Sequence, residues 1–461
     1  MKSRFRITGG LTSELLKLIL DDVHQLVGEI GLEIDHGELL RELADHTGVT
    51  VKGNRVCYDP SLVEAARRQV PVEDTNYATT KPGEEDFVMR PPFSPFDVLD
   101  FKTGKKRPAR ESDVVEGARL YDAFDCTGPV HVHIANMDQR LAPIHIAKLC
   151  AENSRGVGNW SAAYNYEQTV CIRDMFLAAG RDEPAVAFEM THSPLRLDSY
   201  FLDILMRARR SENGVRGLTA GGGAMPLPGV SAPIYWRSAA AQGLAECLGG
   251  WITAKLIDPA VKPYASFLAW APDMSTCKWT HHTPDALLFS LFTRQVMKEL
   301  LGLTVYAPCD DLNRMCLLAM QGVRIFESAG VRRECFSLAH VPVDREKIYF
   351  AEAVVGGLEI PEEPGLTARI IRETFPETAF LMHETTLDYR RLYWHPRVFT
   401  KETPARLAEL LMADSDELLA EAREIARKKI SANDFALADD VRREVEKIYR
   451  HGRRAVLRLP G

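Results

Sequence analysis

The chain has 461 residues, of which 46% are hydrophobic and 26% charged, so it carries enough apolar side chains to bury a large core. Its formal net charge is −7, and lysine and arginine alternate with aspartate and glutamate rather than forming basic blocks. This balance argues against electrostatic binding of nucleic acid or of an anionic membrane surface. We therefore expect neither nucleic acid nor a membrane among its partners.

The N-terminal residues and the cysteines both favour a cytoplasmic protein. Residues 1–10 contain three cations, but no apolar run long enough for a signal sequence follows them. Residues 11–30 are interrupted by charges, which predicts an amphipathic helix rather than a membrane span. The nine cysteines are scattered, odd in number and without a C-x-x-C pair, so a disulfide framework is not expected.

The first hundred residues predict a helical cap. Apolar residues at helical spacing indicate a helix over residues 11–32, capped by Thr12 or Ser13 and ended by Gly31. A short helix over 36–44, two β-like pieces around Gly53-Asn54 within 49–58, and a helix over 60–70 follow. Residues 74–107 are rich in proline, glycine and charge and predict an extended crossing segment.

After this segment, short apolar runs alternate with helical stretches. The predicted strands are 130–134, 156–163, 185–190, 215–219, 263–268, 303–307, 323–326 and 335–339. Strands separated by helices are typical of a parallel (β/α)8 barrel of the TIM type, in which both faces of each strand are covered. The alternative is an open doubly wound sheet, but no G-x-G-x-x-G follows any strand, which argues against a dinucleotide-binding version.

The C-terminal third predicts helices that pack on this barrel. Residues 415–450 are strongly helical and rich in opposite charges three or four residues apart. We therefore divide the chain into a cap and crossing segment (1–107), a barrel (108–350) and a C-terminal helical extension (351–461).

Functional groups of a parallel barrel project from the carboxyl ends of its strands and from the loops that follow. A single carboxylate there is about as often a helix cap as a catalytic group, so each residue by itself is weak evidence. We assign no catalytic residue, and the candidate substrate-binding residues are Tyr164, Glu189, His192, Trp270, Asp273, Tyr306, Asp310, Phe326, Glu327 and His340.

Metal and nucleophile chemistry are less well supported. Cys277 with His281-His282, and Cys309-Asp310-Asp311, contain the atoms that bind zinc, but neither has the usual ligand spacing. No G-x-S-x-G elbow occurs. The Gly221-Gly222-Gly223 triplet lacks the lysine of a phosphate loop and is better explained by close approach of backbones. We therefore expect no bound metal.

Aromatic residues near the predicted strand ends suggest a cationic ligand. Trp270, Tyr306 and Phe326 are among them, and aromatic faces that converge on one mouth attract a quaternary ammonium by about 0.5–2 kcal/mol per ring. For any one of these residues, ordinary core packing is the competing explanation.

Several segments resemble the trimethylamine methyltransferase family, including its non-pyrrolysine members that demethylate quaternary amines. Residues 224–233 (AMPLPGVSAP) resemble the family's M-P-x-x-G-x-x-A-P segment and precede a small-residue helix and Asp258-Pro259. Residues 29–36 with 53–56 and 60–63, residues 97–100 with 103–104 and 107–109, and residues 383–387 with 394–396 are similar too. Together these segments span most of the chain in the family's order.

The resemblance implies a TIM-type barrel that moves a methyl group from a methylated amine to the reduced cobalt of a separate corrinoid protein. The cobalamin would thus be carried by the partner, with no cofactor bound tightly here. Pyrrolysine, which trimethylamine demethylation uses, does not occur in this sequence, so a betaine-type quaternary amine is the expected substrate. We also expect the chain to form a homo-oligomer.

Two positions depart from the family pattern. Asp273-Met274 match its D-M-R element, but Ser275 replaces the arginine, and residues 308–320 are shorter than the family's corresponding loop. Two alternatives therefore stay open: a non-catalytic binder of methylated amines on the same scaffold, and a zinc-dependent barrel methyltransferase. In the methyltransferase interpretation, Trp270, Tyr306 and Phe326 form part of the cation cage. His192 or His340 binds the carboxylate tail, and Asp273, Asp310 and Glu327 form the polar wall.

Overall fold

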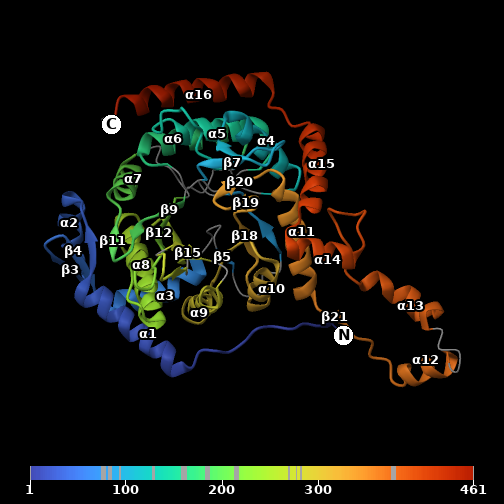
Figure 1. Ribbon diagram of the computed structural model, residues 1–461. Helices are drawn as coiled ribbons and strands as arrows, with labels where there is room; N and C mark the ends of the chain where they lie inside the picture. The colour runs from blue at the N-terminus through green and yellow to red at the C-terminus, as the bar shows by residue number, and fades with distance from the viewer. Residues whose placement is uncertain are drawn as a thin grey trace.

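The chain folds into a mixed α/β structure in which helices surround several short sheets (Figure 1). The computed structural model describes residues 2–73, 79–80, 86–92, 95–126, 130–156, 163–181, 187–211, 218–267, 270–276, 278–280, 283–374 and 380–459. The predicted α/β class is confirmed.

The N-terminal region contains the predicted helices and hairpin. α1 (Ser13–Gln25) begins where Thr12 Oγ1 accepts a hydrogen bond from the backbone N–H of Leu15 at 3.2 Å, an N-cap. It continues as a short π-helix and ends at Gly31, whose φ of 73° suits glycine. The elements that follow are α2 (Gly37–Leu43), β3 (Val49–Lys52), β4 (Arg55–Tyr58) and α3 (Pro60–Glu73).

This region is joined to a much later segment through one sheet. The sheet has the order β10 (Thr191–His192), β11 (Arg196–Leu197), β2 (Leu32–Ile34), β4 and β3. β11 lies parallel to β2, with Leu197 opposite Ile34. Backbone hydrogen bonds therefore fix the cap against the loop that follows one of the central strands.

Three central strands pair in parallel, in the order the alternation of strands and helices predicts. β12 (Thr219–Ala224) lies between β9 (Ala187–Glu189) and β13 (Lys262–Phe267). α8 (Trp236–Ile257) packs on β12 so closely that a Cβ on Gly222 would lie 2.1 Å from Cα of Cys247. The glycine triplet thus serves close backbone approach, as predicted.

The segment interpreted as an extended crossing contributes strands that the sequence did not predict. β6 (Val88–Met89) extends the parallel pair of β17 (Ala307–Pro308) and β18 (Ile325–Glu327). β7 (Asp97–Leu99) lies parallel to β20 (Cys335–Phe336) and antiparallel to β8 (Lys106–Pro108), while β5 (Thr79–Thr80) pairs with β16 (Thr304–Val305). Strands of two or three residues are too short to show a period in the sequence.

Helices surround these strands in Figure 1. They are α4 (Glu111–Asp122), α5 (Ala142–Asn153), α6 (Tyr166–Ala178), α7 (Ser199–Arg210), α8, α9 (Pro284–Leu301), α10 (Leu312–Gln321) and α11 (His340–Gly356). Of the predicted strand 130–134, only Ile134 forms a bridge, with Ala109, and most of 156–163 lies outside the described residues. No sheet of the described residues closes on itself, so the barrel stays a prediction.

The C-terminal region forms an outer layer and an arm. α14 (Pro404–Ala413) and α15 (Asp416–Ala432) lie beside α11, and α16 (Asp439–Leu457) crosses α5 and α6 (Figure 1). Between α11 and α14, a segment with α12 (Leu366–Thr374) and α13 (Glu384–Tyr389) extends away from the ring of helices. Every helix in the described ranges is too short or too polar to span a bilayer.

Candidate functional site

The loop after β12 has a defined conformation held by its own side chains. Ser231 Oγ accepts a hydrogen bond from the backbone N–H of Leu227 at 3.0 Å, and the backbone N–H of Gly229 donates to the oxygen of Ala232 at 2.8 Å. Gly229 has a φ of 78°, a value that favours glycine. This loop coincides with the 224–233 segment that the sequence analysis singled out.

A buried pair on α8 holds this loop and a second loop together. Nε2 of Gln242 donates to the backbone oxygen of Ser231 at 2.9 Å and to Oε1 of Glu246 at 2.9 Å. The Glu246 carboxylate also accepts hydrogen bonds from Ser193 Oγ at 2.7 Å and from the backbone N–H of Leu195 at 2.9 Å. Burial raises the pKa of Glu246, and these hydrogen bonds oppose that effect. The loops after β10 and β12 therefore share one polar anchor, which the sequence analysis missed.

Large apolar side chains are exposed on and beside the β12 loop. A Cβ on Gly229 would lie 2.9 Å from Ile234 Cδ1 and 3.3 Å from Met274 Cε, so the loop contacts the hairpin that follows β13. Isolated exposed apolar residues need no explanation, whereas contiguous apolar patches often belong to interaction sites. The group, called here the apolar rim, consists of Met225 (47% exposed), Val230 (53%), Ile234 (49%), Tyr235 (75%) and Met274 (59%).

Trp270 and Asp273 belong to that hairpin. Trp270 directly precedes β14 (Ala271–Asp273), which pairs with β15 (Lys278–Thr280). Oδ1 of Asp273 accepts hydrogen bonds from Ser275 Oγ at 2.6 Å and from its backbone N–H at 2.8 Å, which lower the pKa of the carboxyl. Ser275, which departs from the family pattern, therefore closes the turn with Asp273.

A second polar group, buried, lies at the ends of β17 and β18. The guanidinium of Arg332 lies 2.6 Å from Oδ1 of Asp344 and 3.1 Å from Oδ2 of Asp414. Nζ of Lys347 is 3.5 Å from Asp414 and donates to the backbone oxygen of Asp310 at 3.1 Å. Oδ2 of Asp310 pairs with Arg314 at 2.8 Å. We call Asp310, Arg314, Arg332, His340, Asp344, Lys347 and Asp414 the buried charge cluster.

Burial and neighbouring charges set protonation in this cluster. Burial disfavours the charge of Arg332, but Asp344 and Asp414 outweigh it and hold the Arg332 pKa above the ordinary arginine range. Nδ1 of His340 forms a hydrogen bond with Ser337 Oγ, 2.7 Å away, and Nε2 of the same ring lies 3.8 Å from Asp414. Burial, assisted by the charge of Arg332, lowers the His340 pKa to about 3, so this imidazole is neutral at pH 7.

Two of the predicted aromatic residues lie in the core. Phe326 is fully buried and stacks on Phe87, with ring centroids 6.0 Å apart. Tyr306 is also buried, and its backbone oxygen accepts a hydrogen bond from Arg294 on α9. Burial lowers the pKa of Arg294 to about 9, and the charge of Arg314 contributes. Glu327 is the last residue of β18, and its backbone oxygen accepts a hydrogen bond from the backbone N–H of Cys309.

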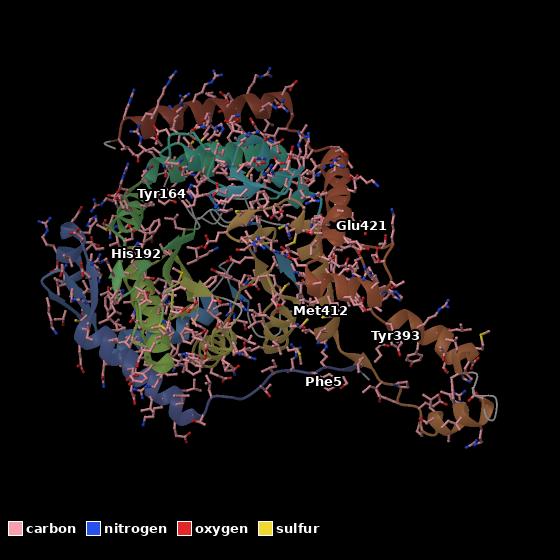
Figure 2. All side chains as sticks on the ribbon, viewed as in Figure 1. Phe5, Tyr164, His192, Tyr393, Met412 and Glu421 are labelled. Atoms are coloured by element: carbon pink, nitrogen blue, oxygen red, sulfur yellow. The ribbon has the colours of Figure 1, made fainter. Side chains whose placement is uncertain are left out.

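The remaining predicted residues lie elsewhere. His192 is exposed and its Nε2 lies 2.8 Å from Asp198 Oδ2, while Tyr164 is 49% exposed ahead of α6; both are labelled in Figure 2. Glu189 ends β9, with its backbone opposite Gly221 of β12, and its side chain is outside the described residues. The structure thus brings Asp310 and His340 into one cluster through Lys347 and Asp414, and Trp270 and Asp273 into one hairpin.

The metal alternatives are only partly within the described ranges. Those ranges contain no group of three His, Cys, Asp or Glu side chains able to hold a metal ion. Cys277, His281 and His282 lie outside them. Cys309 is buried, and burial raises the pKa of its thiol. The cysteines within the described ranges form no disulfide.

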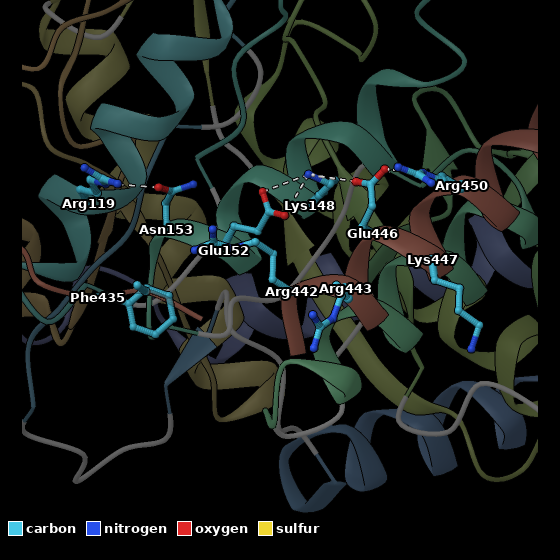
Figure 3. A pocket seen from close by; sticks show the side chains of 11 residues that line it. Arg119, Lys148, Glu152, Asn153, Phe435, Arg442, Arg443, Glu446, Lys447 and Arg450 are labelled. Atoms are coloured by element: carbon cyan, nitrogen blue, oxygen red, sulfur yellow. Dashed lines mark hydrogen bonds and ion pairs between the residues drawn. The ribbon is translucent and has the colours of Figure 1, made fainter. Parts of the chain in front are cut away.

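The described residues also line cavities away from the strand ends. The cavity in Figure 3, about 640 Å³, lies between α5 and α16, and Nζ of Lys148 there bridges Glu152 at 2.9 Å and Glu446 at 3.4 Å. A cavity of about 480 Å³ lies beside Asn136 and His145. A third, of about 880 Å³, lies between the end of α11 and residues 389–394.

Comparison with known proteins identifies the family. The family model described as trimethylamine methyltransferase matches residues 1–304, which is more than half of the chain and includes the β12 loop, its anchor and the β14–β15 hairpin. No individually curated protein matched the chain. Membership in this family implies methylamine methyltransferase activity toward a corrinoid protein. The chain belongs to the trimethylamine methyltransferase family.

Proposed function

We propose that the chain transfers a methyl group from a betaine-type quaternary amine to cobalt(I) of a separate corrinoid protein. The observation that carries this proposal is the family match over residues 1–304. The absence of pyrrolysine from the sequence supports a quaternary rather than a tertiary amine as the substrate.

The reaction requires positioning more than acid–base chemistry. The bond between nitrogen and the methyl carbon breaks, its electron pair stays on nitrogen, and the methyl carbon bonds to the cobalt, which supplies the pair of electrons for the new bond. A quaternary amine leaves as a neutral tertiary amine, so the departing nitrogen needs no proton. The chain must therefore orient the substrate with one methyl group exposed to the incoming protein.

The loops after β12 and β13 are the part of the structure best suited to this task. We place the ammonium group against Trp270, because an indole face is the strongest of the aromatic partners for a cation. The loop after β12 is rigidly anchored through Gln242 and Glu246, and the apolar rim around it offers a contact surface for a second protein. Asp273 shapes the polar side of the same hairpin.

The buried charge cluster contributes to substrate binding only indirectly. Asp310 and His340 are both held by neighbours within it, and His340 is neutral. We therefore assign the cluster to positioning the strand ends of β17 and β18 rather than to binding the substrate carboxylate, and His192, which is exposed, remains the proposed carboxylate contact.

The test combines the protein, a reduced corrinoid protein and a panel of betaines, and follows the cobalt absorption spectrum. We expect at least one quaternary amine to abolish the cobalt(I) absorption band. Trimethylamine should leave that band unchanged. If no member of a broad panel changes the spectrum, methyl transfer is wrong. Calorimetric binding of a betaine without turnover would instead support a non-catalytic binder.

A further inference from the structure

The cavity between α5 and α16, shown in Figure 3, is rich in cationic side chains. Over the whole chain, acidic residues outnumber lysine and arginine by 64 to 57. The lining of this cavity of about 640 Å³ has the opposite balance, with six cations against two carboxylates. The six cations are Arg119, Lys148, Arg442, Arg443, Lys447 and Arg450. The excess of positive charge is therefore local to this cavity.

Helix α16 gathers four of these cations on one side, although acidic residues separate them in the sequence. Successive residues of an α-helix are about 100° apart, so Arg442, Arg443, Lys447 and Arg450 fall within an arc of about 140°. The opposite side of the helix, which includes the buried Val445, packs on α5 and α6. The alternating charges of the sequence thus become a basic face only in the folded helix.

Hydrogen bonds before and after this stretch of α16 hold it against α4 and α5. Near the C-terminal end of α16, the hydroxyl of Tyr449 lies 3.0 Å from Nδ1 of His145, and Nε2 of His145 lies 2.9 Å from Glu111 on α4. Ahead of α16, Nδ2 of Asn433 donates to the backbone oxygen of Arg119 at 3.0 Å. The walls of the cavity are therefore in place before a ligand binds, which lowers the cost of ordering them on binding.

Both carboxylates of the lining are already paired with cations of the lining. Nζ of Lys148 lies 2.9 Å from Glu152 and 3.4 Å from Glu446, and Nε of Arg450 lies 2.6 Å from Glu446. Lys447 pairs at 3.1 Å with the glutamate three residues before it, which is outside the lining. These pairs account for three of the six cations.

The other three cations are guanidinium groups without a carboxylate partner. Nε of Arg119 donates to Oδ1 of Asn153 at 3.2 Å, and this amide is neutral. Within the described ranges, the side chains of Arg442 and Arg443 form neither an ion pair nor a hydrogen bond, and no dashed line reaches them in Figure 3. Like charges around one cavity repel each other, so an anion in the cavity would lower the electrostatic energy of the chain.

We propose that this cavity binds a small phosphate-bearing anion of several negative charges, of the diphosphate type. Guanidinium forks donate pairs of N–H groups to phosphate oxygens. The oxygens of a phosphate group point in tetrahedral directions, so one group can accept from Arg119 on α4 and from Arg442 or Arg443 on α16. The volume lies in the range of about 300–1,000 Å³ that is typical of small-molecule sites, so it admits a ligand larger than a single phosphate ion.

The experiment titrates the full chain with inorganic diphosphate by calorimetry, at an ionic strength held constant with chloride. We expect saturable binding of one diphosphate per chain. Citrate, which spreads a similar charge over separate planar carboxylates, should bind about tenfold more weakly, the effect of losing one hydrogen bond to a charged group. Binding of citrate as tight as that of diphosphate would overturn the assignment to phosphate.

Substitutions test whether the unpaired guanidinium groups are the ligands. Arg442→Gln and Arg119→Gln should each weaken diphosphate binding about 10- to 100-fold, because each removes a charge-assisted hydrogen bond. Arg442→Lys keeps the charge but not the fork, and it should weaken binding less than Arg442→Gln. Arg454→Gln is the matched control, since Arg454 is an exposed arginine of the same helix that lies outside the lining.

Arg454→Gln should leave the affinity for diphosphate unchanged. An equal loss of affinity in Arg454→Gln and Arg442→Gln would show that only the net charge of α16 matters, and it would overturn the proposal. Absence of saturable diphosphate binding to the wild-type chain would overturn it as well. Circular dichroism checks that each variant keeps its helices. None of these measurements depends on methyl transfer, so the site and the proposed function can fail separately.

Discussion

Nε2 of Gln242 lies 2.9 Å from the backbone oxygen of Ser231 and 2.9 Å from Oε1 of Glu246, so a single buried amide joins the family's loop after β12 to the carboxylate that holds residues 193–195. The position of one loop therefore depends on the position of the other. If these loops shape the substrate site, the amide controls activity without touching the substrate.

Replacement of Gln242 by leucine is expected to lower kcat/KM for methyl transfer about 10- to 100-fold, because misplacement of a positioning loop by about 1 Å has effects of this size. Gln295→Leu is the matched control. Gln295 is equally buried (6% against 5%) and donates to Glu299 on α9 as Gln242 donates to Glu246 on α8. Equal kcat/KM values for the two variants would refute the positioning role of Gln242, whatever their stabilities.

Trp270→Leu tests the proposed cation contact. Loss of one aromatic face is expected to weaken betaine binding by about 0.5–2 kcal/mol, or about 2- to 30-fold in Kd, while Trp270→Phe retains part of the affinity. Calorimetric titration with the substrate identified in the activity panel measures both. Unchanged affinity in Trp270→Leu would remove Trp270 from the site.

Asp344→Ala breaks an ion pair in which the carboxylate is fully buried, and it leaves the Arg332 guanidinium without its closest carboxylate, 2.6 Å away. We expect the free energy of unfolding to fall by about 3–5 kcal/mol, since an uncompensated buried charge has a cost of this order. Urea unfolding measures the change. Lys447→Met removes a pair in which the lysine is 76% exposed and should have little effect, because exposed ion pairs contribute little. Similar losses of unfolding free energy in both variants would contradict the expected difference between the buried and the exposed ion pair.

Acid stability depends on the His340 ring, which faces Arg332, Lys347 and Asp414. Its folded-state pKa of about 3 is below that of an unfolded histidine, so the unfolded chain binds the extra proton first as the pH falls. This group's stabilising contribution is present above pH 6.5 and declines toward pH 3, by about 1.4 kcal/mol per pH unit.

His340→Gln should reduce this slope of unfolding free energy between pH 6.5 and pH 4, as measured by urea titration at each pH. His131, which is buried and also has a pKa lowered to about 3 by burial, is the comparison: His131→Gln should reduce the slope to a similar extent. A His340→Gln slope identical to that of the wild-type chain would show that the ring is not buried as a neutral group.

Gly222→Ala tests the contact between β12 and α8. Its Cβ would lie 2.1 Å from Cα of Cys247, a backbone atom that no rotamer change can move away. We expect a loss of stability larger than the roughly 1–3 kcal/mol of ordinary overpacking, seen as a lower Tm or as insoluble protein. Gly37→Ala, where a Cβ would have no atom within 4 Å, should leave Tm nearly unchanged.

Local signals along the chain predicted the α/β class, most helices, the hairpin of residues 49–58 and the family. Helical spacing, the Thr12 cap and the Gly53-Asn54 turn are local signals, and short-range interactions decide them. The MPLPGVSAP segment identified the family without a structure, and the family match ends at residue 304, just before the segment 308–320 that departs from the family pattern.

Long-range packing sets which charges are buried together and which apolar residues stay exposed, and no local pattern reveals it. Arg332, Asp344 and Asp414 come from a two-residue strand (Val331–Arg332), a helix and a helix junction, and no spacing in the sequence links them. The short strands of the crossing segment depend on partners far along the chain, so they have no local signal. Likewise, Met382 and Tyr393 resemble any core residues in the sequence, and only the direction of the arm leaves them in solvent.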